Sequence, residues 1–202
     1  MNANASHTPM GSTWPHHAGL RMDADRFFQI HEDETNYELI DGVVTVTPSP
    51  SPKHQHVTGE IYIQLSLYLR QSPVGFVFLE TDVHLGQGPT GGDLVYRPEI
   101  AFIRREHVAT ITDKLSGPPA LVVEVVSRGS RRMDSETKKL DYERFGVQEY
   151  WLIDPERQMM SFFRLDAGRY VEVDAVGSAW PSDAVPGFVL DLDAVREAFR
   201  PW

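Results

Sequence analysis

Ala120-Leu121-Val122-Val123-Glu124-Val125-Val126, residues 120–126, is an apolar run rich in β-branched side chains with one carboxylate inside it. Such a run is typical of a strand that is buried on both faces of a sheet. A carboxylate in that setting costs free energy unless a partner neutralises it. Glu124 is therefore the first candidate for a functional role.

A second carboxylate interrupts the apolar stretch Arg97-Pro98-Glu99-Ile100-Ala101-Phe102-Ile103. Glu99 follows a proline, which suits the start of a strand. Two acids on neighbouring strands repel each other unless a cation lies between them, and carboxylate oxygens are the usual ligands of Mg²⁺. Glu99 and Glu124 together therefore predict a metal site.

The segment after Glu124 predicts a helix over residues 134–145, ended by Gly146, and then a strand over residues 148–153. A strand, helix and strand of this length predict a parallel pair with a right-handed crossover.

One face of the predicted helix carries Asp134, Lys138, Tyr142 and Phe145, which are spaced four, four and three residues apart. The two aromatic side chains indicate that this face packs on the sheet. Lys138 is then held near the strand ends. The alternative is an Asp134–Lys138 ion pair on the helix surface.

Several ordered motifs, taken together, resemble the Uma-type family of bacterial endonuclease-like proteins, part of the PD-(D/E)XK nuclease superfamily. The resemblance extends from about Tyr37 to the C-terminus. The motifs are Tyr37-Glu38-Leu39-Ile40-Asp41-Gly42, Pro98-Glu99, Glu124-Val125-Val126-Ser127, the positions Asp134, Lys138 and Tyr142, and Gly146-Val147-Gln148-Glu149-Tyr150-Trp151-Leu152-Ile153-Asp154-Pro155.

The chain departs from the family pattern at two positions. The first metal acid is usually Asp and is Glu99 here, and Val126 stands where the lysine of Glu-X-Lys belongs. Lys138, on the following helix, is the matching lysine.

The resemblance implies a mixed α/β (α+β) fold with a restriction-endonuclease-like core. In that core a central mixed β-sheet is flanked by helices, with an added N-terminal hairpin and C-terminal β-structure. It implies a metal-dependent endonuclease that uses Mg²⁺ or Mn²⁺ and cleaves nucleic acid, with DNA as the expected substrate. The catalytic residues would be Glu99, Glu124 and Lys138, and the metal would be bound by Glu99, Glu124 and the carbonyl of Val125.

Five further residues are expected to support the metal ligands or to contact substrate. For Glu38 a solvent-facing side chain is the alternative, and for His54 it is a plain surface histidine. The five are Glu38, His54, Ser127, Asp134 and Tyr142.

The rival interpretation of the whole chain is a catalytically weakened or inactive nuclease fold that serves as a binding or assembly module. The longer side chain of Glu99 and the displaced lysine both allow it. A serine hydrolase using Ser127 is disfavoured, because the pattern Gly-X-Ser-X-Gly is absent around it.

Length and composition predict one domain over residues 22–202, after a flexible leader over residues 1–21. The chain has 202 residues, is 41% hydrophobic and lacks cysteine, which fits a reducing, cytoplasmic environment. No apolar run is long enough for a bilayer.

The net charge of −10 argues against a general nucleic-acid coat protein. The distribution softens this objection, because residues 97–144 carry ten basic and eight acidic side chains, a net charge of +2 that leaves −12 for the rest. Ordinary solvated charges are the alternative explanation.

Outside these motifs the pattern predicts a hairpin of residues 37–40 and 43–47, a helix over residues 53–70, and a hairpin of residues 161–165 and 170–173. Exposed aromatic residues near the C-terminus would support a homodimer, which suits cutting both strands of a duplex. The alternative is that Trp180 and Trp202 are core or tail residues.

Overall fold

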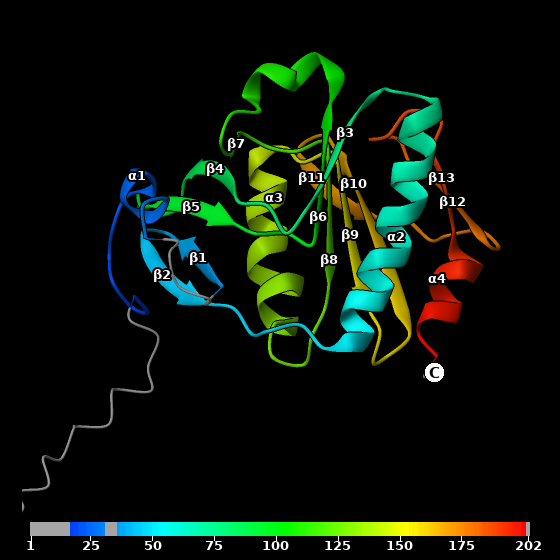
Figure 1. The fold of residues 1–202 in the computed structure, drawn as a ribbon, viewed down its shortest axis with the longest axis horizontal. Helices are drawn as coiled ribbons and strands as arrows, with labels where there is room; N and C mark the ends of the chain where they lie inside the picture. Colours follow the sequence, from blue (N-terminus) through cyan, green and yellow to red (C-terminus); the bar gives the residue numbers. More distant parts are fainter. Residues whose placement is uncertain (1–16, 31–35, 201–202) are drawn as a thin grey trace, which may run out of the picture.

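The structure, a computed structural model, describes residues 17–30 and 36–200. A six-stranded mixed sheet lies at its centre (Figure 1). The strands in spatial order are β11 (Arg169–Glu172), β10 (Met159–Asp166), β9 (Glu149–Asp154), β8 (Leu121–Val125), β6 (Ile100–Arg104) and β3 (Gly75–Leu79). β8 and β9 pair in parallel, as predicted, and the other neighbours are antiparallel.

A second, five-stranded sheet lies beside the first (Figure 1). Its strands in order are β2 (Val43–Val46), β1 (Tyr37–Ile40), β5 (Asp93–Tyr96), β4 (Val83–Gln87) and β7 (Leu115–Ser116). The predicted N-terminal hairpin is confirmed, and its turn residues Asp41 and Gly42 have φ values of 51° and 77°. The hairpin is the edge of this sheet rather than an isolated addition.

The expected leader over residues 1–21 is too long. Gly19 donates its N–H to the carbonyl of Val44, and Arg21 bridges to Val43. Residues 17–21 therefore lie along β2, and α1 (Ala24–Phe27) follows with Asp23 as its N-cap. Residues 1–16 are outside the described part of the chain.

The longest helix, α2 (Pro52–Gln71), packs on one face of the six-stranded sheet beside α4 (Leu192–Ala198) (Figure 1). The Ser51 hydroxyl accepts the N–H of His54 and caps the helix. Val57, Ile61 and Leu65 are buried in a core cluster that includes β8 and β9 side chains. The 3.6-residue apolar period thus explains this helix.

The opposite face of the sheet is covered by the segment predicted as one helix over residues 134–145. The structure corrects this prediction in part, because a π-helical segment η2 (Met133–Lys138) precedes the α-helix α3 (Lys139–Phe145). Gly146, with φ of 82°, ends the helix in the left-handed conformation, as predicted. Wide turns of this kind are frequent at functional sites.

The C-terminal part adds the β10–β11 hairpin and a small pair of strands, β12 (Ala179–Pro181) and β13 (Val189–Asp191). Trp180 is 2% exposed and stacks on Phe162 with ring centroids 4.3 Å apart. Trp180 is thus a core residue and offers no exposed aromatic surface for a homodimer. Trp202 lies outside the described residues.

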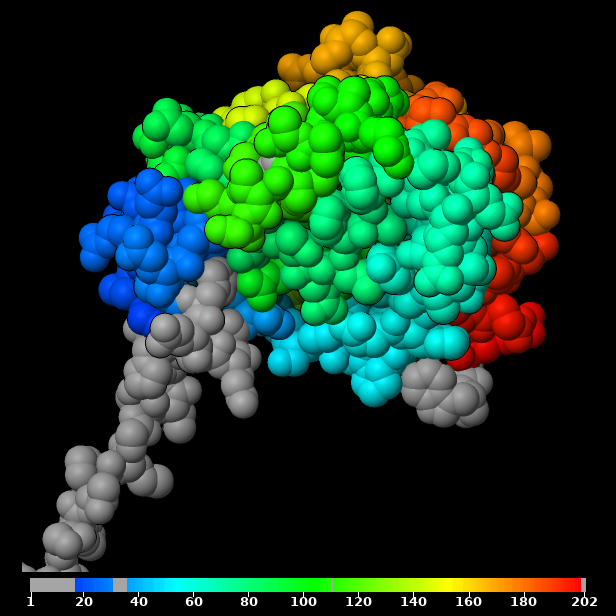
Figure 2. Space-filling model, turned by 45° about the horizontal axis from the view of Figure 1, so that its top comes forward, coloured from blue at the N-terminus to red at the C-terminus, as the bar shows by residue number. Residues whose placement is uncertain are grey.

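In the space-filling view the N-terminal elements occupy one side of the surface and the C-terminal elements the opposite side (Figure 2). Between β6 and β8 the chain passes through the 3₁₀ helix η1 (Arg105–Thr110). Across residues 17–30 and 36–200, no helix has both the length and the apolar character needed to cross a membrane.

Candidate active site

The two predicted metal acids lie opposite each other at one end of neighbouring strands. Ile100 of β6 pairs with Val123 of β8 in antiparallel register. Glu99 immediately precedes Ile100 and Glu124 immediately follows Val123, so continued register places the two carboxylates side by side. Side chains alternate along a strand, so Glu124 faces the same side as Val122, toward η2 and α3.

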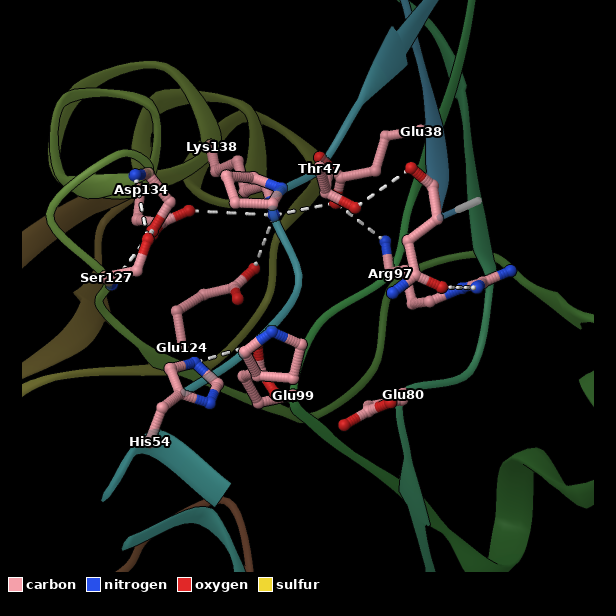
Figure 3. Close-up of a pocket in the computed structure, with 14 residues that line it drawn as sticks. Glu38, Thr47, His54, Glu80, Arg97, Glu99, Glu124, Ser127, Asp134 and Lys138 are labelled. Carbon is pink, nitrogen blue, oxygen red and sulfur yellow. Dashed lines mark hydrogen bonds and ion pairs between the residues drawn. The ribbon is translucent and has the colours of Figure 1, made fainter. Parts of the chain in front are cut away.

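Lys138 lies among three carboxylates (Figure 3). Its Nζ is 2.7 Å from Oε1 of Glu38, 3.1 Å from Oε1 of Glu124 and 3.6 Å from Oδ1 of Asp134. All four residues are at most 4% exposed. The Asp134–Lys138 pair therefore exists, but it is buried in this cluster, and the alternative of a surface ion pair is wrong.

Glu38 comes from β1 and ties the two sheets together. Its Oε1 accepts the backbone N–H of Arg97 at 2.9 Å in addition to the lysine contact. The Arg97 guanidinium forms two hydrogen bonds with the carboxylate of Asp82. Glu38 is buried, so the solvent-facing alternative is wrong. Arg97, two residues before Glu99, is held through both its backbone and its side chain.

His54 lies in the first turn of α2, and its Nε2 is 3.2 Å from Oε1 of Glu99. It is 5% exposed, so the surface-histidine alternative is wrong. Burial lowers the pKa of His54, but the hydrogen bond and charge of Glu99, with help from the Val125 carbonyl, raise the net pKa above its usual value. His54 therefore contacts Glu99 directly from the start of α2.

The remaining predicted residues are also close by. The Tyr142 hydroxyl donates to Oε1 of Glu124 at 3.1 Å. Ser127 lines the same cavity, and its hydroxyl is hydrogen-bonded to the hydroxyl of Ser130 at 3.0 Å. The carbonyl of Val125 lies near His54 and contributes to the rise in its pKa. The fold thus brings the predicted site residues into one region of the molecule.

Burial and neighbouring charges shift the pKa values of Glu124 and Lys138. The pKa of Glu124 is raised well above its usual value by burial and by the charges of Asp134, Glu38 and Glu99, against the opposing effect of Lys138. Burial lowers the pKa of Lys138, but its carboxylate neighbours raise it well above its usual value. Lys138 is therefore a fixed cation among an excess of acids, and the site favours additional positive charge.

Two carboxylate oxygens are available for a cation. Oε2 of Glu99 is buried without a hydrogen bond. The hydrogen bonds of Glu124 within the described residues end on Oε1, which leaves its Oε2 without a partner. The cavity beside them has a volume of about 60 Å³, enough for a cation with roughly four water-sized ligands.

This donor set fits a hard divalent cation. No group of three His, Asp or Glu side chains within residues 17–30 and 36–200 forms a complete metal cage. Mg²⁺ commonly binds to one or two carboxylates and takes its other ligands from water and substrate phosphate. Glu99 and Glu124 therefore suit such an ion, whereas a structural zinc site would need more protein ligands.

Sequence reasoning missed several residues of the cavity wall. Arg97 immediately precedes the Pro98-Glu99 motif, and this position could have identified it as a residue of the cavity wall. The others come from loops and strand ends whose approach depends on the packing of the two sheets. The missed residues are Asn36, Thr47, Pro48, Pro50, Glu80, Arg97 and Ser130.

Comparisons with known proteins identify a family and a similar fold. A family model described as "Putative restriction endonuclease" matches residues 24–193. A solved structure described as "a putative nuclease belonging to DUF820", from Anabaena variabilis ATCC 29413, is 19% identical in sequence with a TM-score of 0.72. The match covers 89% of this chain and 99% of that chain, and it supports the fold. No curated protein matches. Because its family model matches most of the chain, this protein belongs to the Uma2 family.

Proposed function

We propose that the protein is a nuclease that hydrolyses phosphodiester bonds in DNA with the aid of Mg²⁺ or Mn²⁺. The observation that carries the proposal is the pairing of Glu99 and Glu124 at neighbouring strand ends, each with one carboxylate oxygen that lacks a hydrogen bond. Family membership supports a nuclease in general terms.

The carboxylates of Glu99 and Glu124, with the carbonyl of Val125, would hold the cation. When bound, a divalent cation supplies a Lewis acid for the phosphate and lowers the pKa of a water molecule. His54 fixes the orientation of Glu99 through the contact at Nε2. Tyr142 does the same for Glu124 through its hydroxyl.

Lys138 would supply the second positive charge. Its high pKa keeps the ammonium charged at neutral pH. In that state it holds Oε1 of Glu124 and offsets negative charge that develops on the phosphate in the transition state. Glu38 and Asp134 position the ammonium by accepting its other contacts.

A nuclease fold with weakened activity is the second candidate, and the lysine geometry favours it. The Lys138 ammonium contacts three carboxylates, so substrate must compete for its charge. Such a protein would bind nucleic acid without efficient cleavage.

The deciding experiment is cleavage of supercoiled plasmid and of labelled single strands in Mg²⁺, Mn²⁺ or EDTA. Wild type is compared with Glu124→Gln and with Glu172→Gln, a control at an exposed position of the same sheet. We expect cation-dependent cutting that falls at least about 1,000-fold in Glu124→Gln and persists in the control. The absence of cutting by wild type, with no Mn²⁺ binding by calorimetry, would reject the enzyme and favour the binding module.

A further inference from the structure

A second cavity, of about 330 Å³, opens beside the candidate active site. Pro48, His54 and Ser127 line both cavities, so the two are neighbouring parts of one depression. The second cavity extends from His54 and Ser127 along the first turn of α2 to the β9–β10 turn. Its volume is sufficient for a nucleotide-sized group.

Lys53 supplies a positioned charge on the wall of this cavity. Its side chain is half-buried, and Nζ donates to the carbonyl of Pro155 at 2.8 Å. No ion pair of Lys53 is found within the described part of the chain. A carbonyl fixes the ammonium without neutralising it, so the charge remains available to an anion.

Arg128 adds a second positive charge at the cavity rim. Its side chain is 85% exposed, and the guanidinium lies 3.6 Å from the carboxylate of Glu156. That carboxylate also contacts Arg131, which is paired more closely with Asp154 at 2.9 Å. Of the Lys, Arg, Asp and Glu side chains that line this cavity, Lys53 and Arg128 are cations and Glu156 is an anion, so its wall carries one excess positive charge.

The rest of the wall suits a sugar-phosphate group. Pro48, Val126 and Pro155 offer apolar surface for a sugar. Ser49, Ser51 and Gly129 provide hydroxyl groups and an open backbone at the side where α2 begins. The positive end of the 20-residue helix adds to the lysine and arginine charges.

We propose that this cavity binds the phosphate and sugar of the nucleotide next to the scissile phosphate, with Lys53 and Arg128 as the phosphate ligands. The inference rests on the proposed function, because it places a substrate strand across the two cavities. The substrate is then a strand that continues past the cleavage point, and the phosphate that enters this cavity adds binding energy without taking part in the chemistry.

Binding without cleavage tests the proposal. All variants are made in the Glu124→Gln protein, and the anisotropy of fluorescein-labelled single strands of about 20 nucleotides, and of the matching duplex, is followed over a range of salt concentrations. Lys53→Ala/Arg128→Ala is compared with Arg26→Ala/Arg70→Ala. The control removes two exposed charges from α1 and from the far end of α2.

We expect the cavity variant to bind at least about tenfold more weakly, with a salt slope lower by about 1, because a phosphate contact is lost. The control should bind as the parent does. Arg128→Ala alone, at an exposed position, should show part of the loss without any effect on folding.

Unlabelled strands of two to eight nucleotides, used as competitors, locate the contact. In the parent, the affinity should rise stepwise with length, and the step that fills the second cavity should disappear in Lys53→Ala/Arg128→Ala. Equal binding by the cavity and control variants would overturn this subsite alone. A parent protein that binds none of the strands would overturn the proposed function and the subsite with it.

Discussion

Glu124 and Glu149 are buried glutamates on adjacent parallel strands, and their surroundings differ. Leu121 pairs with Glu149 and Glu124 pairs with Leu152, so the two acids lie at opposite ends of the β8–β9 pair. Glu149 is completely buried and Glu124 is 3% exposed. Burial alone therefore does not distinguish a structural carboxylate from a functional one.

Glu149 is fully satisfied by donors. Oε1 accepts from Arg164 and from the N–H of Asp183, and Oε2 accepts from Trp151 and from Ser182. These bonds fasten the segment before β13 to the central sheet. A carboxylate with donors on both oxygens contributes to stability and has no free oxygen for a ligand.

Glu124 has its hydrogen bonds on one oxygen and three other acids nearby. Lys138 and Tyr142 both contact Oε1, while Asp134, Glu38 and Glu99 raise its pKa together with burial. Ionisation of Glu124 therefore costs free energy in the folded state, and a bound cation would lower that cost. An unfilled oxygen and like-charged neighbours therefore distinguish Glu124, the acid that we propose as a cation ligand, from Glu149.

The largest expected effect on stability comes from Lys138→Met, which removes the charge that balances Glu124. Three buried carboxylates would remain, and we expect the free energy of unfolding at pH 8 to fall by about 3–5 kcal/mol. Urea unfolding measures the change. Lys139→Met is the matched control, because Lys139 lies over the Phe163 ring rather than in the site, and it should cost at most about 1 kcal/mol.

The same variant has a characteristic pH dependence. Burial raises the pKa of Glu124, and in the variant Lys138 no longer opposes that effect, so the folded state binds more protons than the unfolded chain. The stability of the variant therefore falls as the pH rises above the unfolded reference pKa of 4.5, and it recovers as the pH is lowered toward 5. A loss of equal size at pH 5 and pH 8 would contradict the charge-balance argument.

A matched pair of amide substitutions tests the comparison directly. Glu149→Gln places an amide donor against existing donors, and we expect a loss of roughly 3 kcal/mol in urea unfolding. Glu124→Gln keeps an acceptor for Lys138 and Tyr142 and removes repulsion from neighbouring acids. It should be neutral or stabilising by about 1 kcal/mol at pH 8.

The stability difference between Glu124→Gln and the wild type depends on pH. The folded pKa of Glu124 lies above the reference of 4.5, so ionisation destabilises the folded state above that pH. The advantage of Glu124→Gln should therefore shrink as the pH falls toward 4.5. Equal destabilisation by the two amides would show that both acids are structural.

The smallest effect concerns His54, which can be followed by NMR titration in EDTA. We expect a pKa above 6.5 in the wild type and below 6.5 in Glu99→Gln, because burial then acts without the opposing carboxylate. Since the folded pKa is raised, the stabilisation from this pair is present below pH 6.5 and is lost as the pH rises through the folded pKa. An unchanged His54 pKa in Glu99→Gln would show that the Glu99 carboxylate does not set the pKa of His54.

Local patterns predicted much of the molecule. The apolar run of residues 120–126 predicts strand β8, and the turn at Asp41 and Gly42 predicts the β1–β2 hairpin. Both predictions depend only on residues that are close together in the sequence. The helix after Glu124 was predicted with the correct end at Gly146, but its π-helical start was not. Asp134 and Lys138 are buried within this segment, and local spacing does not encode contacts with distant parts of the chain.

The sequence by itself determined the candidate acids and the strand–helix–strand unit that carries Glu124, because these follow from periodicity and from the cost of a carboxylate in an apolar run. The family resemblance identified Lys138, and helical spacing gave the face on which it lies. Only the tertiary structure decided that Glu38 shares Lys138 with Glu124, that His54 holds Glu99, and that Glu149 is structural. These contacts join segments far apart in the chain, and their geometry depends on the packing of two sheets and a helix end.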